Sequence, residues 1–195
     1  MEETRDSKKS LLDEIINRLA VFSAEELQEK RARIEKNLLE FANFMEAQLA
    51  LLYTERSSEI PTGTIIRKSL GVKKGIVLPA LTDSKHKISL LRINDYDKDL
   101  IKRDYENLEP DPAVCKKVSV DQIDIAVIPG LAFDEKGGRL GFGDGFYNRL
   151  ITRLPETTRK VSIAFEEQIV DQIQMESRKF NVDIIITDKR VIYKI

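Results

Sequence analysis

Apolar positions in the first fifty residues recur with the period of an α-helix. Between residues 8 and 22, Leu11, Ile15 and Leu19 form one stripe, with Leu12 and Ile16 beside it. The segment Ser23-Ala24-Glu25-Glu26 has the pattern of a capping box and predicts the start of a second helix. That helix is expected to run toward Tyr53, because apolar residues follow at helical spacings: Leu27, Ile34, Leu38, Phe41, Met45, Leu49 and Leu52. A helix of that length is unusual in a globular protein, so we expect a break near Leu49, where residues 49–53 can instead form a buried strand.

The second half of the chain alternates short apolar runs with polar or amphipathic segments. The candidate strands are Ile76–Pro79, Ile88–Ile93, Ile123–Pro129, Lys160–Phe165, Val182–Thr187 and Val191–Ile195. Several are apolar on consecutive residues, which is typical of strands buried on both faces. The candidate helices are residues 62–70, 145–154 and 166–175, and the polar residues 94–122 are expected to form a long surface excursion. This alternation predicts an α/β fold with helices over a largely parallel or mixed sheet.

Composition narrows the class of protein. The length of 195 residues fits one domain over residues 1–195. The 32 basic and 33 acidic residues give a net charge of −1, which argues against nucleic-acid or membrane binding by bulk charge. No apolar run approaches the ~18 residues of a membrane span, and the polar start MEETRDSKKS does not resemble a signal peptide. A cytoplasmic location is therefore expected. The single cysteine, Cys115, excludes an intramolecular disulfide, and the single histidine, His86, is expected on a surface turn.

The main candidate for chemistry is a glycine-rich segment. Five of the nine glycines lie between residues 137 and 145, after a predicted strand and before a predicted helix. Glycines in this position let backbone N–H groups approach a phosphate, and Arg139 and Arg149 can add charge-assisted contacts. The spacing Gly141-x-Gly143-x-Gly145 matches neither a dinucleotide fingerprint nor a P-loop. From spacing alone, a tight structural turn explains these glycines equally well.

The same segment resembles the signature of the 5-formyltetrahydrofolate cyclo-ligase family. The matching positions are Pro129, Gly130, Ala132, Phe133, Asp134, Arg139, Leu140, Gly141, Gly143, Gly145, Tyr147, Arg149 and Leu150. The resemblance extends over almost the whole chain. Further matches are Lys8 and Leu11, Glu59 and Thr62, Leu78-Pro79, Glu109-Pro110, Ala164-Phe165 with Gln168, and Asp183 with Thr187.

This resemblance implies a fold, a reaction and a set of site residues. The implied fold is an α/β three-layer sandwich, with helices on both faces of the sheet and long N-terminal helices. The implied reaction is the ATP-dependent closure of 5-formyltetrahydrofolate to 5,10-methenyltetrahydrofolate, in a monomer or small homo-oligomer whose partners are ATP and a reduced folate. Arg139 and Tyr147 would be catalytic, and Glu59 with Tyr147 would bind the folate. The implied ATP-binding residues are Lys8, Arg139, Gly141, Phe142, Gly143, Asp144, Gly145, Phe146 and Tyr147.

The sequence also departs from the family at positions that handle charge. Leu12 stands where the family has an arginine, and Asn148 and Lys179 stand where it has two aspartates that bind Mg²⁺. Asn148 still offers an amide oxygen to a metal, but Lys179 would repel the ion and could instead neutralise a phosphate. Mg²⁺, expected for the family, is therefore doubtful here. The alternatives are a non-catalytic relative that binds a nucleotide, a folate or another phosphate ligand, and a helical interaction module built on residues 24–53.

Overall fold

The computed structural model describes residues 2–56, 58–81, 88–102, 108–142, 145–173 and 177–194. His86, Gly143 and Asp144 lie outside these ranges. The helices are α1 Glu2–Leu19, α2 Ala24–Leu39, α3 Ala42–Glu46, α4 Gly63–Gly71 and α5 Phe146–Ile151, and the 3₁₀ turns are η2 Val120–Gln122, η3 Glu166–Gln168 and η4 Arg178–Phe180. No helix in the described part of the chain is both long and apolar enough to cross a membrane.

The start of α2 confirms the predicted capping box. The Ser23 hydroxyl accepts a hydrogen bond from the Glu26 amide, and the Glu26 carboxylate accepts one from the Ser23 amide. The end of α2 was predicted too late, because the chain leaves the helix after Leu39 and starts the short α3. This break turns Phe44 into the core and leaves Met45 57% exposed, although the repeat predicted Met45 as the core residue. Residues 49–51 form the buried strand β1, as the alternative interpretation expected.

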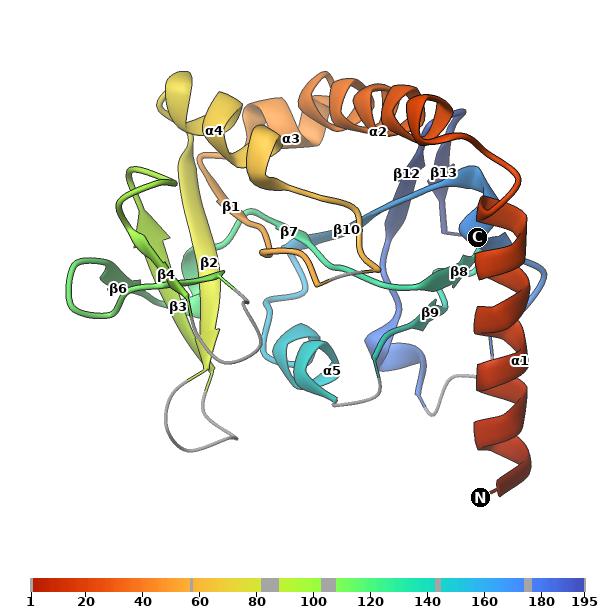
Figure 1. Ribbon diagram of the computed structural model, residues 1–195. Coiled ribbons are helices and arrows are strands. Elements are labelled where there is room, and N and C mark those ends of the chain that lie inside the picture. The colour runs from red at the N-terminus through yellow and green to blue at the C-terminus, as the bar shows by residue number, and fades with distance from the viewer. Residues whose placement is uncertain are drawn as a thin grey trace.

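A large mixed sheet occupies the centre of the molecule (Figure 1). Its strands lie in the order β13 Val191–Tyr193, β12 Ile184–Thr187, β10 Arg159–Ala164, β7 Ile125–Val127, β1 Leu49–Leu51, β2 Gly75–Leu81, β3 Ile88–Ile93 and β6 Lys116–Val118. The central strands from β12 to β2 are parallel, whereas β13, on one side, and β3, on the other, run antiparallel to their inner neighbours. All six predicted strands are present, with slightly different ends.

Two apolar layers cover this sheet. On one face, α2, α3 and α4 bury Ile34, Leu38, Phe44, Ile65 and Ile66 against it. On the other face, α5 buries Phe146, Leu150 and Ile151. The three-layer α/β expectation is confirmed.

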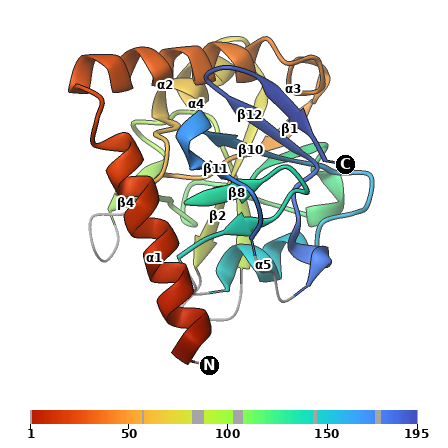
Figure 2. The same cartoon turned by 90° about the vertical axis from the view of Figure 1, so that its right-hand side faces the viewer.

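A second, three-stranded sheet connects the main sheet to α1. It contains β11 Ile169–Val170, β8 Ala132–Asp134 and β9 Arg139–Leu140, in that order. Figure 2 shows α1 running past this sheet, away from α2. The stripe on α1 packs there, since Ile15 is buried with Ala132, Leu140 and Ile173. The N-terminal helix therefore covers the segment that leads into the glycine loop.

Two predictions for the loops require correction. Residues 166–175 do not form a helix, because the chain makes the 3₁₀ turn η3 and then pairs β11 with β8. Residues 94–122 are not only a surface excursion. They contain β4 Leu100–Lys102, which pairs with β5 Leu108–Pro110, and the edge strand β6 of the main sheet.

Candidate active site

The strand order changes direction between β1 and β7, which makes this pair the switch point of the sheet. These strands are neighbours, but the chain continues from β1 to β2 on one side and from β7 to β10 and β12 on the other. Ligands of open α/β sheets bind beyond the carboxyl ends of the strands at such a point. The segment after β1 carries Glu55 and Glu59, and the segment after β7 is Ile128-Pro129-Gly130. The predicted folate residue and the predicted phosphate loop therefore start from adjacent strands.

Arg139 lies at the centre of this arrangement and is 7% exposed. Its guanidinium donates to the Pro129 carbonyl at 2.9 Å and to Asn148 Oδ1 at 2.6 Å. The first bond connects it to the turn after β7, and the second connects it to α5. Both of these bonds orient the guanidinium. A buried, oriented positive charge is suited to binding a phosphate.

The glycines around Arg139 are required by close packing. A Cβ on Gly130 would lie 2.8 Å from Arg139 Cγ, and one on Gly141 would lie 2.6 Å from Arg139 Nη1. Gly145 has a φ of 67°, a left-handed conformation that favours glycine, and it precedes α5. α5 has only six residues, shorter than the predicted 145–154, so its dipole adds little. Anion binding here would depend on Arg139 and the loop backbone.

The loop after β1 approaches the glycine loop from the other side. Glu59 accepts a hydrogen bond from the Arg56 amide at 2.9 Å, and the Arg56 guanidinium lies 5.2 Å from the centre of the Phe142 ring. Tyr53 is buried beneath this loop and donates to the Ile60 carbonyl at 2.9 Å. Glu59 is thus placed on the same side of the molecule as the glycine loop.

Tyr147 and Glu59 both lie near enough to the buried phenol of Tyr53 to influence its charge. Burial raises the pKa of Tyr53 well above its ordinary value, and the nearby Glu59, Tyr147 and Glu55 raise it further. Tyr147 is half-buried and stacks edge-on against Phe146, with ring centres 5.0 Å apart. Tyr147 also packs against the cores on both faces of the sheet. A half-buried aromatic ring near a carboxylate can bind a planar ligand that carries N–H donors.

The N-terminal helix α1 carries Lys8, which was predicted to bind ATP, and Leu12, which stands where an arginine was expected. Leu12 is half-buried and packs against the cluster of Ile15, Ala132 and Leu140. The family's arginine is therefore replaced by a packing residue. Lys8 lies one turn before Leu12 and is exposed. Residues i and i+4 of a helix share a face, so Lys8 lies on the same side of α1 as Leu12.

The residues at the expected metal position do not form a magnesium site. Asn148 Oδ1, the expected ligand, accepts a hydrogen bond from the Arg139 guanidinium. Lys179, expected at the second metal position, is exposed on η4, which packs beside α5, so this position offers an ammonium group rather than a carboxylate. Mg²⁺ requires oxygen ligands, usually with one or two carboxylates. Within the ranges that the structure describes, no group of three His, Cys, Asp or Glu residues could hold a metal.

Sequence reasoning missed two buried polar residues that organise the site. Asp134 is 2% exposed and accepts hydrogen bonds from the backbone amides of Lys136, Gly138 and Ile173. It therefore closes the turn that leads into Arg139. Gln168 is 3% exposed and donates to the Leu131 carbonyl at 3.0 Å. Both residues belong to matched motifs, so the motif itself was the signal, although it gave no role.

Comparison with known proteins identifies the family. The model of the "5-formyltetrahydrofolate cyclo-ligase family" matches residues 4–188. A Caenorhabditis elegans protein named "Probable 5-formyltetrahydrofolate cyclo-ligase" is 27% identical over 97% of this chain and 93% of its own length. The Escherichia coli K12 5-formyltetrahydrofolate cyclo-ligase is 25% identical over 91% of this chain and 98% of its own.

A solved structure agrees with these matches. The NMR structure of Aquifex aeolicus 5,10-methenyltetrahydrofolate synthetase has a TM-score of 0.81 and 27% sequence identity, and covers 97% of this chain and 92% of its own. The relatives carry the names of enzymes over nearly their full length, which disfavours a non-catalytic relative or a helical interaction module. This chain belongs to the 5-formyltetrahydrofolate cyclo-ligase family, a family of ligases.

Proposed function

We propose that this protein uses ATP to close 5-formyltetrahydrofolate to 5,10-methenyltetrahydrofolate, with release of ADP and phosphate. One observation carries the proposal. The buried guanidinium of Arg139 is held at the switch point of the sheet, beside the loop that presents Glu59. A phosphate-binding group and a carboxylate that can accept hydrogen bonds from the N–H edge of a pterin thus lie on segments that leave adjacent strands, which supports a reaction between ATP and a folate.

The proposed reaction transfers a phosphoryl group and then forms a ring. The formyl oxygen on N5 of the folate attacks the γ-phosphorus of ATP, the bond to the bridging oxygen breaks, and ADP leaves. The nitrogen N10 then attacks the activated formyl carbon and loses its proton. Cleavage of the carbon–oxygen bond releases phosphate and leaves the methenyl bridge between N5 and N10.

This chemistry requires positioning and charge stabilisation rather than a protein nucleophile. Arg139 would hold the triphosphate together with the loop backbone from Gly141 to Tyr147, and Lys8 would approach from α1. Glu59 would accept hydrogen bonds from the folate, which fixes the formyl group. Tyr147 would lie where the two ligands meet, because it is placed near both Glu59 and the loop. No step is assigned to Mg²⁺, because the residues at its family position do not fit the ion.

A direct assay tests this function. Purified protein, ATP and 5-formyltetrahydrofolate are mixed, with and without Mg²⁺, and the methenyl product is followed by its absorbance. We expect product that depends on both substrates and on Arg139. Absence of turnover with intact folate and ATP binding would contradict the enzyme and favour a diverged binding protein. We further propose a cytoplasmic protein of one domain, monomeric or a small homo-oligomer, which cell fractionation and light scattering would test.

A further inference from the structure

Gln168 connects two loops at the carboxyl edge of the main sheet. It lies in the turn η3, directly after β10, and its side chain is almost wholly buried. Its Oε1 accepts a hydrogen bond from the Phe165 amide at 2.8 Å, and its Nε2 donates to the Leu131 carbonyl at 3.0 Å. One amide thus joins the end of β10 to the turn that follows β7. A side chain must both accept and donate to do this, which an ionised glutamate cannot.

The turn held by Gln168 also holds Arg139. Leu131 follows Pro129 and Gly130, and the Pro129 carbonyl accepts the 2.9 Å bond from the guanidinium. The Leu131 amide in turn donates to the Leu140 carbonyl at 2.7 Å, next to Arg139 in β9. The backbone at Gly130 is closely packed, because a Cβ there would lie 2.6 Å from Phe133 Cζ and 2.8 Å from Arg139 Cγ. A shift of the Leu131 carbonyl would therefore move the guanidinium.

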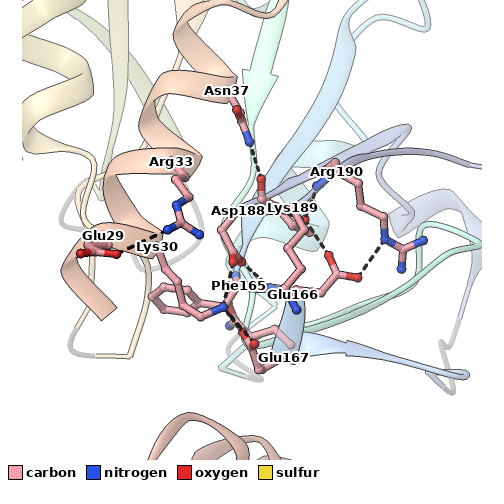
Figure 3. Close-up of polar contacts among 12 residues, drawn as sticks. Glu29, Lys30, Arg33, Asn37, Phe165, Glu166, Glu167, Asp188, Lys189 and Arg190 are labelled. Carbon is pink, nitrogen blue, oxygen red and sulfur yellow. Dashed lines mark hydrogen bonds and ion pairs between the residues drawn. The ribbon is translucent and has the colours of Figure 1, made fainter. Parts of the chain in front are cut away.

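The turn η3 is itself anchored to two helices. Figure 3 shows the buried Lys30 of α2 bonded to both Glu167 and Asp188. Asp188 also accepts from the Glu166 amide at 2.9 Å, and the Arg18 guanidinium of α1 donates to the Glu167 carbonyl at 3.4 Å. Ionic contacts thus fix the backbone on either side of Gln168. The residue is a rigid connection between the helical layer and the turn behind Arg139.

We propose that Gln168 is a positioning residue for the ring-closing reaction, acting through the Pro129–Leu131 turn to aim Arg139 at the triphosphate. This inference rests on the proposed role of Arg139 in binding ATP. It assigns no contact between Gln168 and either substrate. Loss of the Gln168 hydrogen bonds should therefore weaken the binding of ATP and leave the binding of folate almost unchanged.

The variant Gln168→Glu tests the donated hydrogen bond. Its carboxylate still accepts from the Phe165 amide but faces the Leu131 carbonyl without a proton, and both burial and that carbonyl raise the pKa of such a group. We expect kcat/KM for ATP at pH 8 to fall roughly 10- to 100-fold. The ratio of variant to wild type should recover as the pH is lowered and the group regains a proton to donate. The KM for 5-formyltetrahydrofolate should stay within about twofold of the wild-type value, since the proposed hydrogen bonds between the folate and Glu59 are not changed.

Asn37→Asp provides the matched control. The Asn37 amide also donates to a carbonyl at the same edge of the sheet, that of Thr187 at 2.8 Å, but on the far side from the glycine loop. We expect a comparable loss of stability with unchanged kcat/KM for ATP at every pH. An equal loss of activity in both variants, or a ratio for Gln168→Glu that does not change with pH, would overturn the positioning role.

A double-mutant cycle keeps the proposal testable if Gln168→Glu does not fold. Gln168→Met removes both hydrogen bonds and introduces no charge. The cycle combines this substitution with Arg139→Lys. If Gln168 acts through Arg139, it should weaken calorimetric ATP binding roughly 10-fold in the wild type and hardly at all in Arg139→Lys. Additive effects would overturn the proposal. A wild type that binds ATP without turnover would contradict the proposed function alone, whereas one that does not bind ATP would overturn both.

Discussion

The orientation of the Glu59 carboxylate is set by the loop that carries it. Its Oε2 accepts the Arg56 amide, and the same loop places Arg56 over Phe142 of the glycine loop. The carboxylate is thus oriented before any ligand arrives, which lowers the entropic cost of binding. Tyr53, buried below and bonded to the Ile60 carbonyl, supports this loop from the core.

The substitution Glu59→Gln should separate the two ligands. An amide keeps the shape but loses the charge and presents a donor where a pterin also has donors, so we expect folate affinity to fall by about 1.5–3 kcal/mol. ATP affinity should change less than about twofold, since Arg139 is untouched. Calorimetric titration with each ligand measures this, with Glu156→Gln on the exposed surface as the control. A parallel loss of ATP binding would show that Glu59 supports the whole crevice rather than the folate.

Individual residues of this site were predictable only where a motif names them. Arg139 and the glycines follow from the resemblance, but their geometry does not. Two acceptors of Arg139, Pro129 and Asn148, lie ten and nine positions away. The β8–β9 hairpin brings Arg139 back to Pro129, and the packing of α5 brings Asn148 to it. The motif also includes Gln168 and Asp134, but it gives them no role, and only their burial and hydrogen bonds show that each organises a turn.

At the scale of elements, α1 is held by a narrow apolar contact. Ile15 is 3% exposed against the small sheet, whereas its neighbour Ile16 is 62% exposed. The charged residues Glu2 to Lys9 extend beyond this contact, and Lys8 is among them. The docking of α1, rather than its helix propensity, therefore decides whether Lys8 can reach the loop.

Ile15→Ala should loosen this helix. We expect a loss of about 2–5 kcal/mol in the free energy of unfolding, as is typical for a truncated buried isoleucine. The KM for ATP should rise as well, because Lys8 loses its fixed position. Urea denaturation and limited proteolysis of the N-terminal segment measure the first effect, and steady-state kinetics the second. Ile16→Ala is the matched control, with a change within about 0.5 kcal/mol. Equal behaviour of the two variants would contradict the packing of α1.

The ionic cluster around Lys30 makes the contact between α2 and the sheet depend on pH. Burial opposes the charge on Asp188, but hydrogen bonds from Lys30 and the Glu166 amide outweigh it and hold the pKa of Asp188 below its ordinary value. Burial also opposes the charge on Lys30, and Asp188 and Glu167 raise its pKa overall. The cluster therefore stabilises the fold at intermediate pH, where Asp188 and Lys30 are both charged. The stabilisation from Asp188 is present above its unfolded pKa of about 3.9 and is lost as the pH falls through its folded pKa. The stabilisation from Lys30 is present below about 10.4 and is lost as the pH rises through its folded pKa.

Lys30→Met should reveal this pH dependence. The buried Asp188 and the half-buried Glu167 lose their partner, so we expect a loss of about 3–5 kcal/mol at pH 7. Without the ammonium group, burial raises the pKa of Asp188. As the pH falls, Asp188 is protonated in the variant, and the cost of burying its unpaired charge disappears. The difference from wild type should therefore shrink between pH 7 and about pH 4. Chemical denaturation at each pH measures it, with the exposed pair Lys68 and Glu35 as the control through Lys68→Met. A difference that stays constant over this range would argue against the ionic role.

The elements were more predictable than their ends. Apolar runs such as residues 184–187 predict buried strands because the parallel centre of a sheet is covered on both faces. The break after Leu39 has no glycine or proline to announce it, and the helical repeat continues through it. Residues 166–175 carry the pattern of a helix, but β8 offers an unpaired edge that β11 fills, a contact between distant segments that a local pattern does not contain.

At the scale of the whole molecule, the site carries an unusual charge balance. Two aspartates and one Mg²⁺ in the family sum to zero, whereas Asn148 and Lys179 sum to +1 without a metal. The bond from Arg139 to Asn148 Oδ1 keeps its geometry with a neutral acceptor, so the amide does not offset the guanidinium. The exposed Lys8 on α1 and Lys179 on η4 add positive charge from two further elements. The molecule as a whole carries a net charge of −1.

The final prediction is that Mg²⁺ binds weakly to the protein alone and stimulates turnover little. At a separation of ~4 Å and an effective dielectric of ~20, each unit-charge interaction is worth about 4 kcal/mol before solvation. Even a fraction of that, contributed by Lys179 and Arg139 together, would empty a weak site at millimolar Mg²⁺. The double variant Asn148→Asp with Lys179→Asp replaces +1 by −2 and should make activity depend on Mg²⁺. Activity and ATP affinity are measured across Mg²⁺ concentrations, including with a chelator. Lys73→Asp, on the opposite edge of the sheet, controls for the two units of charge that Lys179→Asp changes. A wild type with full turnover only in the presence of Mg²⁺ would show that other carboxylates have taken over the role of the two lost aspartates.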